Sequence, residues 1–319
     1  NEYKGIAHAP GVNGSVVSFD SQKEIYVNPM DVNFEGVDYA TLQEIIAEKT
    51  DFIITLLSSC MRRDIDSGEQ GILEKDTTAL PVITDMSAEE QERKYSPTLQ
   101  DVYQKLKDME NDVTAQKLAA HMQIFVNGSL NLFNHKTNID LNRKFLVFDI
   151  SGIKENLRVT CMLVMLEIVK TKIKWNFARG NWTNVYIDEF HELLGVPAVA
   201  DYVIKLWKEV GKLHGSMTGI TQNMTDLINK SPNSDKLAAI LSNTEYFAML
   251  NQSTIDRRLL ADFLPSISPA MFNFVEGASK GTGLLKMGPV TVPFDMRMSN
   301  ECKLYQYVNT DGNNQDSAI

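Results

Sequence analysis

The sequence is poor in cysteine and contains no paired cysteine motif. Its 319 residues include three cysteines, Cys60, Cys161 and Cys302, and none of them stands in a C-x-x-C pair. This scatter argues against a disulfide framework or a cysteine-rich metal site, and it is typical of unpaired thiols in a reducing cytoplasm. We therefore expect the three side chains to be buried as small apolar groups.

Long apolar runs and a surplus of positive charge are also missing. No apolar run approaches the roughly 18 to 20 residues that a membrane-spanning helix requires, and the first residues, Asn1–Lys4, do not resemble a signal peptide. The net charge is −10, whereas a protein that coats duplex DNA needs a broad basic surface. Any contact with nucleic acid is therefore expected to be local, for example inside a channel.

The chain does have an ordinary globular composition and enough length for a buried core. Hydrophobic residues make up 43% of the sequence and charged residues 23%, so a folded protein is expected rather than a disordered one. A chain of this length favours two structural units. The sequence contains no internal repeat and no low-complexity tract.

The first part of the chain changes from a strand pattern to a helical one. Two short strands are predicted at residues 15–19 and 24–27. Residues 41–61 then carry apolar side chains at helical spacing. Further helices are predicted to begin at a cap on Ser87, to begin with Pro97 as the first helical residue, and to cover residues 114–125.

The rest of the chain alternates strands with helices. Strands are predicted at residues 143–150, 184–188, 216–221 and 246–250, and helices at residues 157–174, 198–213, 235–241 and 254–263. This alternation predicts right-handed crossovers and a mostly parallel sheet flanked by helices. Residues 282–286 and 290–296, separated by Met287-Gly288-Pro289, predict an antiparallel hairpin at the C-terminal end.

These patterns predict an α/β protein in four parts. They are a first α/β segment at residues 1–37, an all-helical inserted subdomain at residues 38–140, the main α/β part at residues 141–308, and a flexible polar tail at residues 309–319.

Two neighbouring carboxylates follow one of the predicted strands. The apolar run Val185-Tyr186-Ile187 leads directly into Asp188 and Glu189. Nucleotide-hydrolysing sheets use such a strand to place one acid near a magnesium ion and the next beside the attacking water. Asp188 is therefore a candidate magnesium acid, direct or in the second shell, and Glu189 a candidate catalytic residue. The alternative is that both acids cap the helix that follows.

A second strand ends in an amide. The strand at residues 216–221 runs into Gln222 and Asn223, and parallel strands end at one edge of a sheet, so we expect Gln222 near the acid pair. There it would sense a γ-phosphate or orient water; a turn-forming Gln-Asn pair is the alternative. The phosphate-binding loop G-x-x-x-x-G-K-[ST] that should accompany these groups occurs nowhere in the sequence.

Two segments resemble other motifs without completing them. His191-Glu192-Leu193-Leu194 begins like the zinc-protease pattern H-E-x-x-H, but Gly195 stands in the last position, so we interpret His191 as a positioning or packing residue. The glycine-rich stretch at residues 277–283 contains Lys280 but leads into the predicted hairpin rather than a helix. We interpret it as a flexible turn.

Three cations are candidates for contacts with nucleotide. Arg257 and Arg258 follow the strand at residues 246–250, and Lys280 lies in the glycine-rich turn. Solvated charge is the ordinary interpretation of the two arginines. The more specific interpretation is an arginine finger that reaches the nucleotide of a neighbouring subunit. Lys280 is a weaker candidate for the same role.

In this order the motifs resemble a known family. Asn28-Pro29, Phe148-Asp149-Ile150-Ser151-Gly152, the acid-pair strand, Thr221-Gln222-Asn223 and Ser242-Asn243-Thr244 are similar to the C-terminal motor domain of the large conjugative type IV secretion ATPase, the TraE/TrbE-like branch of the HerA/FtsK superfamily. The resemblance covers nearly the whole chain. Asn1-Glu2-Tyr3 looks like the end of a D-P-x-x-E-Y motif, which places the phosphate loop and one core strand of the family just before residue 1.

The resemblance implies a fold, an activity and a cellular setting. It implies a RecA-like sheet that binds ATP and Mg²⁺, with Glu189 as catalytic base, Asp188 as magnesium acid and Gln222 as γ-phosphate sensor. It also implies a homo-oligomer, expected to be a hexamer, that works with other secretion components in the cytoplasm at the inner face of the plasma membrane. Such a motor would power channel assembly or the transfer of protein, DNA or both; DNA contact stays open.

Two other functions remain open from the sequence alone. One is a coupling-protein-like pump for single-stranded DNA. The other is a non-catalytic interaction module, in which the acid pair is structural and the helical subdomain docks partner proteins. Because the phosphate loop is absent, we expect the 319-residue chain by itself not to hydrolyse ATP.

Overall fold

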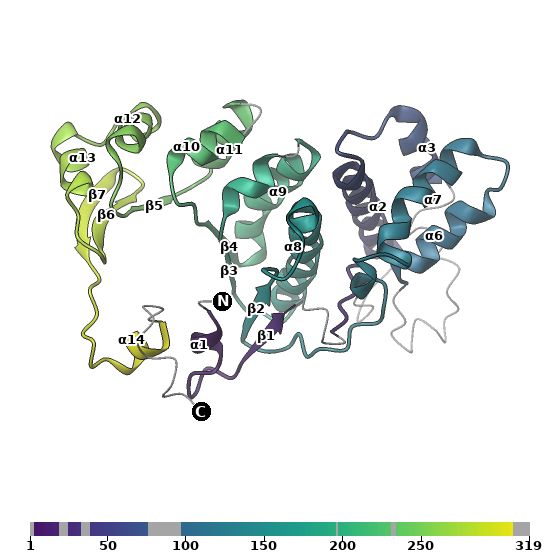
Figure 1. Ribbon diagram of the computed structural model, residues 1–319, viewed down its shortest axis with the longest axis horizontal. Helices are drawn as coiled ribbons and strands as arrows, with labels where there is room; N and C mark the ends of the chain where they lie inside the picture. Colours follow the sequence, from purple (N-terminus) through teal and green to yellow (C-terminus); the bar gives the residue numbers. More distant parts are fainter. Residues whose placement is uncertain are drawn as a thin grey trace.

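The computed structural model describes residues 3–18, 25–32, 39–75, 97–195, 197–230 and 234–308. The helices in these ranges are α1 (Lys4–Ala7), α2 (Tyr39–Met61), α3 (Ser67–Lys75), α6 (Leu99–Asp108), α7 (Val113–Val126), α8 (Glu155–Ala178), α9 (Pro197–Glu209), α10 (Met224–Lys230), α11 (Ser234–Ser242), α12 (Thr254–Phe263), α13 (Pro269–Glu276) and α14 (Lys303–Val308). Short 3-10 helices are η1 (Asn131–Phe133), η2 (Phe190–Gly195) and η3 (Val210–Leu213). Figure 1 shows the strands in the middle and left of the view and the early helices α2, α3, α6 and α7 on the right.

Four of the strands form two parallel pairs. These strands are β1 (Gly14–Ser18), β2 (Phe145–Asp149), β3 (Thr183–Ile187) and β4 (Gly215–Gly219). β1 pairs with β2 so that Ser18 lies opposite Asp149, and β3 pairs with β4 so that Ile187 lies opposite Gly219. The predicted parallel pairing is confirmed, and the residues that follow β3 and β4 emerge at one edge.

The C-terminal strands form a separate antiparallel sheet. β6 (Thr282–Met287) and β7 (Val290–Asp295) make the predicted hairpin, which is confirmed. The expectation that the strand at residues 246–250 continues the parallel series was wrong, because β5 (Tyr246–Met249) pairs antiparallel with β6. Gly283 allows this approach, since a Cβ there would lie 2.3 Å from the carbonyl oxygen of Met249.

Helix α8 lies at the centre of the fold. It packs against α2 on one side and against β3, η2 and η3 on the other, and Figure 1 shows it between the strands and the early helices. Its middle section is buried, with Cys161, Leu163 and Val164 inaccessible to solvent. A helix that is apolar on several faces is suited to such a central position.

The early helices pack beside this centre. α2 contacts α3, α7, α8 and α9, and α6 pairs with α7. Figure 1 shows α3, α6 and α7 on the far side of α2 from the strands. Asp112 caps α7 by accepting hydrogen bonds from the backbone N–H groups of Thr114 (2.8 Å) and Ala115 (3.0 Å). Helices thus occupy the region predicted to be helical, while the four domain boundaries given above remain predictions.

Two local predictions in this region were wrong. Residues 25–27 form no strand, because their backbone groups bond to loops: the N–H of Val27 donates to the carbonyl of Leu132 and that of Tyr26 to Asn138 Oδ1. Helix α6 begins after Pro97, since Thr98 is the capping residue and its N–H donates to Asp101 Oδ2 at 2.7 Å. The helix start predicted at Ser87 lies outside the described residues.

The cysteines do not share one environment. Cys161 is buried and Cys60 partly buried, and burial raises the pKa of each thiol to about 12. Cys302 is exposed, so the expectation that all three are buried was wrong for this residue. It lies just before α14. Across the described ranges, no helix is both long and apolar enough to cross a bilayer.

Candidate active site

The backbone turns sharply directly after β3, at Asp188 and Glu189. Asp188 is the first residue after β3 and is exposed, and its Oδ1 accepts a 3.0 Å hydrogen bond from the N–H of Glu189. Glu189 has a left-handed backbone with φ of 50°, which costs a residue other than glycine about 1 to 3 kcal/mol. Strain of this kind collects at functional sites. Only a short 3-10 turn follows, so the Asp188 carboxylate bonds locally rather than capping a long helix.

The amide after β4 meets the acid after β3. Gln222 Nε2 donates a hydrogen bond of 2.7 Å to Glu189 Oε1. The strand pairing continues beyond β3 and β4, because the N–H of Ile220 donates to Ile187 and that of Phe190 donates to Ile220. The structure thus brings Asp188, Glu189 and Gln222 to one edge.

Gly219 makes room for this convergence. A Cβ at Gly219 would lie 2.7 Å from the ring of Phe190, and real Cβ atoms do not approach a ring so closely. Phe190 is buried and follows Glu189 directly, so its packing over Gly219 anchors the turn that carries the acids.

His191 contacts both loops that form the site. The imidazole is buried, with 5% of the residue exposed. Its Nδ1 lies 3.3 Å from Thr221 Oγ1, and its Nε2 lies 3.5 Å from both Glu189 Oε2 and Glu192 Oε1. The sequence indicated a positioning or packing residue here but not its partners, because Thr221 is distant in sequence.

Asp256 ties the Gln222 loop to the next helix. Its Oδ1 accepts hydrogen bonds from the N–H groups of Met224 (3.0 Å) and Thr225 (3.2 Å) at the start of α10. Its Oδ2 accepts from the hydroxyl of Ser253, the capping residue of α12. Burial alone would raise the pKa of Asp256, but these hydrogen bonds outweigh it and hold the pKa below its ordinary value. Sequence reasoning missed this residue.

The three candidate cations lie on α12 and in the turn between α13 and β6. Arg257 is next to Asp256 on α12, and its Nη1 forms a 2.8 Å ion pair with Glu276 Oε2 of α13. Arg258 is exposed on α12, and Lys280 is exposed in the turn between α13 and β6. Asp256 therefore connects the helix that carries both arginines to the loop that carries Gln222.

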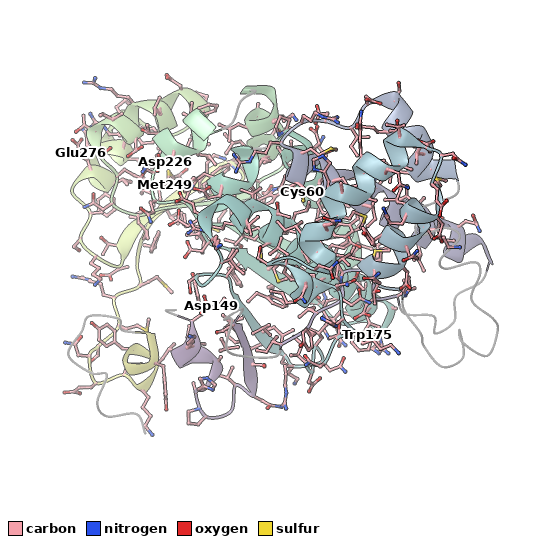
Figure 2. The ribbon with its side chains drawn as sticks, turned by 45° about the vertical axis from the view of Figure 1, so that its right-hand side comes forward. Cys60, Asp149, Trp175, Asp226, Met249 and Glu276 are labelled. Atoms are coloured by element: carbon pink, nitrogen blue, oxygen red, sulfur yellow. The ribbon has the colours of Figure 1, made fainter. Side chains whose placement is uncertain are left out.

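A further acid lies at the end of the neighbouring strand pair, β1 and β2. Asp149, at the end of β2, is buried, and its Oδ1 accepts hydrogen bonds from the N–H (3.1 Å) and hydroxyl (2.6 Å) of Ser151. Its Oδ2 lies 3.4 Å from both the Lys4 ammonium and the Ser18 hydroxyl. Figure 2 labels Asp149 at the lower left of the main body. In the sequence, Asp149 belonged to the motif Phe148-Asp149-Ile150-Ser151-Gly152, and no role was predicted for it.

The donor set suits a magnesium ion that is shared with phosphates. No group of three or more His, Cys, Asp or Glu side chains able to hold a metal exists among the residues that the structure describes. Mg²⁺ is usually held by one or two carboxylates together with substrate phosphates and water, rather than by an all-protein cage. The exposed Asp188 carboxylate fits that pattern, whereas the backbone cradle for the phosphates is not in this sequence.

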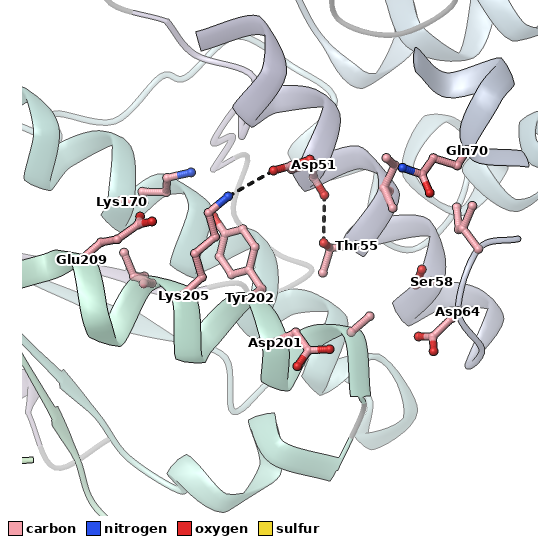
Figure 3. Close-up of a pocket in the computed structure, with 14 residues that line it drawn as sticks. Asp51, Thr55, Ser58, Asp64, Gln70, Lys170, Asp201, Tyr202, Lys205 and Glu209 are labelled. Carbon is pink, nitrogen blue, oxygen red and sulfur yellow. Dashed lines mark hydrogen bonds and ion pairs between the residues drawn. The ribbon is translucent and has the colours of Figure 1, made fainter. Parts of the chain in front are cut away.

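A cavity of about 340 Å³ lies away from these residues. It is found between α2, α3, α8 and α9, and Figure 3 shows its mixed polar lining. Lys205 of α9 reaches across to Asp51 of α2, with Nζ and Oδ2 3.2 Å apart. None of the predicted site residues lines it. The cavity therefore lies at the packing interface of α2 and α3 with α8 and α9, and it is not part of the candidate active site.

Comparison with solved structures identifies the same fold. The chain superposes on VirB4 of Thermoanaerobacter pseudethanolicus with a TM-score of 0.73 at 19% sequence identity, covering 93% of this chain and 79% of that one. It superposes on the plasmid coupling protein TrwB, solved with a non-hydrolysable GTP analogue, with a TM-score of 0.50 at 12% identity, covering 89% and 79%. These likenesses support the RecA-like α/β fold. No curated protein sequence matches the chain.

The family follows from a match over most of the sequence. A family model described as the TraG P-loop domain matches residues 1–261, which include β1 to β5 and all of the acid-pair and Gln222 segments. The chain therefore belongs to the TraG P-loop domain family, which confirms the resemblance to the P-loop ATPases of conjugative type IV secretion.

Proposed function

We propose that this chain is the ATP-hydrolysing motor domain of a conjugative type IV secretion system, which powers channel assembly or the transfer of protein or DNA. The observation that carries the proposal is the hydrogen bond between Gln222 and Glu189 at the shared edge of β3 and β4. It places a carboxylate and an amide together where a parallel α/β sheet binds its ligand.

Glu189 acts as the catalytic base in this proposal. Its Oε1 accepts from Gln222, and its Oε2 faces His191 at 3.5 Å. Two neighbours thus fix the carboxylate, which can accept a hydrogen bond from water and take its proton. Gln222 keeps the other side of its amide for the same water or for a γ-phosphate oxygen, so it couples the state of the nucleotide to the β4 loop.

Asp188 is the magnesium acid in this proposal. Its carboxylate is exposed at the edge of the sheet, and Oδ1 accepts a hydrogen bond from the adjacent backbone N–H, so the other oxygen can serve the metal or a water in its shell. When bound with ATP, Mg²⁺ neutralises charge that develops on the transferred phosphate. Asp188 and the nucleotide would hold the ion together.

Arg257, Arg258 and Lys280 contact nucleotide across a subunit interface in this proposal. Arg257 is already paired with Glu276, so it would exchange that partner for a phosphate when subunits close. This arrangement requires a homo-oligomer, and a hexamer is the form we propose. The motor would work in the cytoplasm at the inner face of the plasma membrane with other components of the system.

The sequence lacks the phosphate loop, so the 319-residue chain alone should not hydrolyse ATP. The test compares this chain with the longest protein that its gene encodes, provided that protein contains G-x-x-x-x-G-K-[ST]. We expect phosphate release only from the longer protein, and loss of release when the loop lysine is replaced by alanine. Robust hydrolysis by the 319-residue chain, or none by the longer protein, would contradict the proposal.

The response to DNA separates a secretion motor from a DNA pump. A coupling-protein-like pump should hydrolyse ATP several times faster when single-stranded DNA is present. A motor for channel assembly should show the same rate with and without it. The same longer protein serves for both measurements.

A further inference from the structure

The cavity between α2, α3, α8 and α9 has the size of a small-molecule site. Its volume of about 340 Å³ falls within the roughly 300 to 1,000 Å³ that ligand sites occupy, and such sites are common where two structural units meet. The cavity has the early helices on one side and helices of the α/β part on the other. A ligand bound here would therefore contact both regions of the chain.

The two lysines of the lining already have carboxylate partners. Lys205 Nζ lies 3.2 Å from Asp51 Oδ2 across the cavity, as the dashed line in Figure 3 marks. Lys170 is buried, and its Nζ lies 3.3 Å from Glu48 Oε2. Because both ammonium groups are paired, the cavity is poorly suited to an anionic ligand.

Two acids of the lining have no cationic partner. The lining contains four acids; one of them pairs with Lys205, and Asp201 pairs with Lys236 at 2.9 Å. The other two, Asp64 and Glu209, form no ion pair within the described ranges, and we call them the end carboxylates. Figure 3 shows them at opposite ends of the cavity. Each can therefore accept hydrogen bonds from a cationic group of a ligand.

Ser58 supplies a buried hydroxyl that has no partner. It lines the cavity from α2, and only 2% of the residue is exposed. No residue of the described ranges forms a hydrogen bond with its Oγ, whereas Oγ of the next serine, Ser59, bonds to Thr160 Oγ1 at 2.8 Å. Figure 3 shows the Ser58 hydroxyl between Thr55 and Asp64, two other residues of the lining. A buried hydroxyl without a partner is unfavourable, so a polar group of a ligand would stabilise it.

The titration of two lining residues indicates a negative electrostatic potential in the cavity. Burial alone would lower the pKa of the Lys205 ammonium, but its hydrogen bond to Asp51 and the other acids around it outweigh burial and raise the pKa. Burial, followed by the charge of Glu167, raises the pKa of the Tyr202 hydroxyl well above its ordinary value. Nearby negative charge shifts a pKa in this direction, so the cavity favours cations over anions.

Apolar side chains lie between the polar groups of the lining. Ile54 is one turn before Ser58 on α2, and Leu206 is about one turn before Glu209 on α9; a spacing of three or four residues puts each pair on one face of its helix. Tyr202, one turn before Leu206, is buried. The lining therefore suits a molecule whose cationic groups are separated by aliphatic carbon atoms.

We propose that this cavity binds a linear aliphatic polyamine, whose terminal ammonium groups pair with the end carboxylates and whose central amine donates a hydrogen bond to Ser58. An ammonium group has three donors and no acceptor, which matches free carboxylates and a free hydroxyl. A divalent metal ion fits less well, since no three metal-ligating side chains gather among the described residues. Binding at this cavity needs no nucleotide, so its result is independent of the ATPase tests.

The test measures binding of spermidine to the 319-residue chain by isothermal titration calorimetry, and we expect one site per chain. Asp64→Asn combined with Glu209→Gln should weaken binding about tenfold, because each partly exposed ion pair contributes about threefold. Ser58→Ala should also weaken binding about tenfold, since it removes a hydrogen bond to a charged group. Ethylamine, which has a single ammonium group, should bind more weakly than spermidine by about tenfold or more.

Matched variants control for fold and for general charge. Asp262→Asn on α12 combined with Glu301→Gln before α14 removes two exposed acids that do not line the cavity. This control loses the same net charge as the end-carboxylate variant but should bind spermidine as the unmodified chain does. Circular dichroism should show that the variants are folded; if Ser58→Ala is not, the end-carboxylate variant alone decides.

Three results would overturn the proposal. The first is that the chain does not bind spermidine, and the second is that the end-carboxylate variant binds it as tightly as the unmodified chain. The third is displacement of spermidine by Mg²⁺ at the same concentration, because a diffuse counterion effect on an acidic protein does not require the cavity.

Discussion

Gln222 Nε2 donates a 2.7 Å hydrogen bond to Glu189 Oε1, joining the loops after β3 and β4. The bond links a strained glutamate to an exposed amide whose loop is held by Asp256. A substitution of either partner should therefore change the position of the other. The activity predictions apply to the longest encoded protein that contains a phosphate loop.

Replacing Gln222 with alanine should slow ATP hydrolysis about 10-fold to 100-fold, because Glu189 loses one of the two contacts that orient it. The dissociation constant for a nucleotide analogue should change less than threefold, since binding depends mainly on the phosphate loop. Steady-state phosphate release and fluorescent nucleotide titration measure the two effects. Gln104→Ala, on the exposed side of α6, is the control; an equal effect of both variants would argue against a role for Gln222.

Replacing Asp256 with alanine should lower the free energy of unfolding by about 2 to 3 kcal/mol. The buried N–H of Met224, the partly buried N–H of Thr225 and the hydroxyl of Ser253 would lose their acceptor. Urea denaturation monitored by circular dichroism measures the change. Asp262→Ala removes an exposed acid from the same helix and should cost less than about 0.5 kcal/mol. Equal costs would show that Asp256 does not hold α10 and α12 together.

The contribution of Asp256 should disappear in acid. Its pKa is lower in the folded chain than in the unfolded one, so the stabilisation is fully present above the unfolded value of about 3.9 and is lost as pH falls through the lower folded value. The difference in unfolding free energy between the unmodified chain and Asp256→Ala should therefore be constant from about pH 5 to 7 and shrink below about pH 4. A difference that grows in acid would have the wrong sign.

A buried ion pair joins α2 to α8 and should be costly to break from one side. Lys49 Nζ lies 2.6 Å from Glu167 Oε1 and also donates to the carbonyl of Pro29, while Glu167 Oε2 accepts from the Tyr202 hydroxyl. Lys49→Met leaves a buried carboxylate unpaired and should lower the unfolding free energy by about 3 to 5 kcal/mol.

The double variant distinguishes charge burial from lost packing. Lys49→Met with Glu167→Gln removes both charges and leaves an acceptor for Tyr202, so it should be more stable than Lys49→Met alone. Lys117→Met on the exposed face of α7 should be close to neutral. If the double variant is the less stable of the two, the unpaired charge is not the cause of the loss. Denaturation in urea gives all of these values.

The sequence predicted the elements near the site well because their signals are local. Apolar strands that end in acids or amides, such as those before Asp188 and Gln222, are readable from composition and order. The contacts of Asp256 with Met224 and Thr225 and of His191 with Thr221 were not readable, because these partners are about 30 residues away in the sequence. The antiparallel pairing of β5 was missed for a similar reason: it depends on Gly283 allowing β6 to approach, which a strand-helix alternation does not reveal.

The most direct measurement of the central claim is ATP turnover by a Glu189→Gln variant that retains its phosphate loop. Removing the base while keeping the shape of the side chain should reduce turnover at least about 100-fold and leave the affinity for ATP within about threefold. Glu192→Gln changes an acid in the 3-10 helix η2 that follows Glu189, and it should retain most of the activity. Turnover by Glu189→Gln equal to that of the unmodified protein would contradict the assignment of this edge as the hydrolytic site.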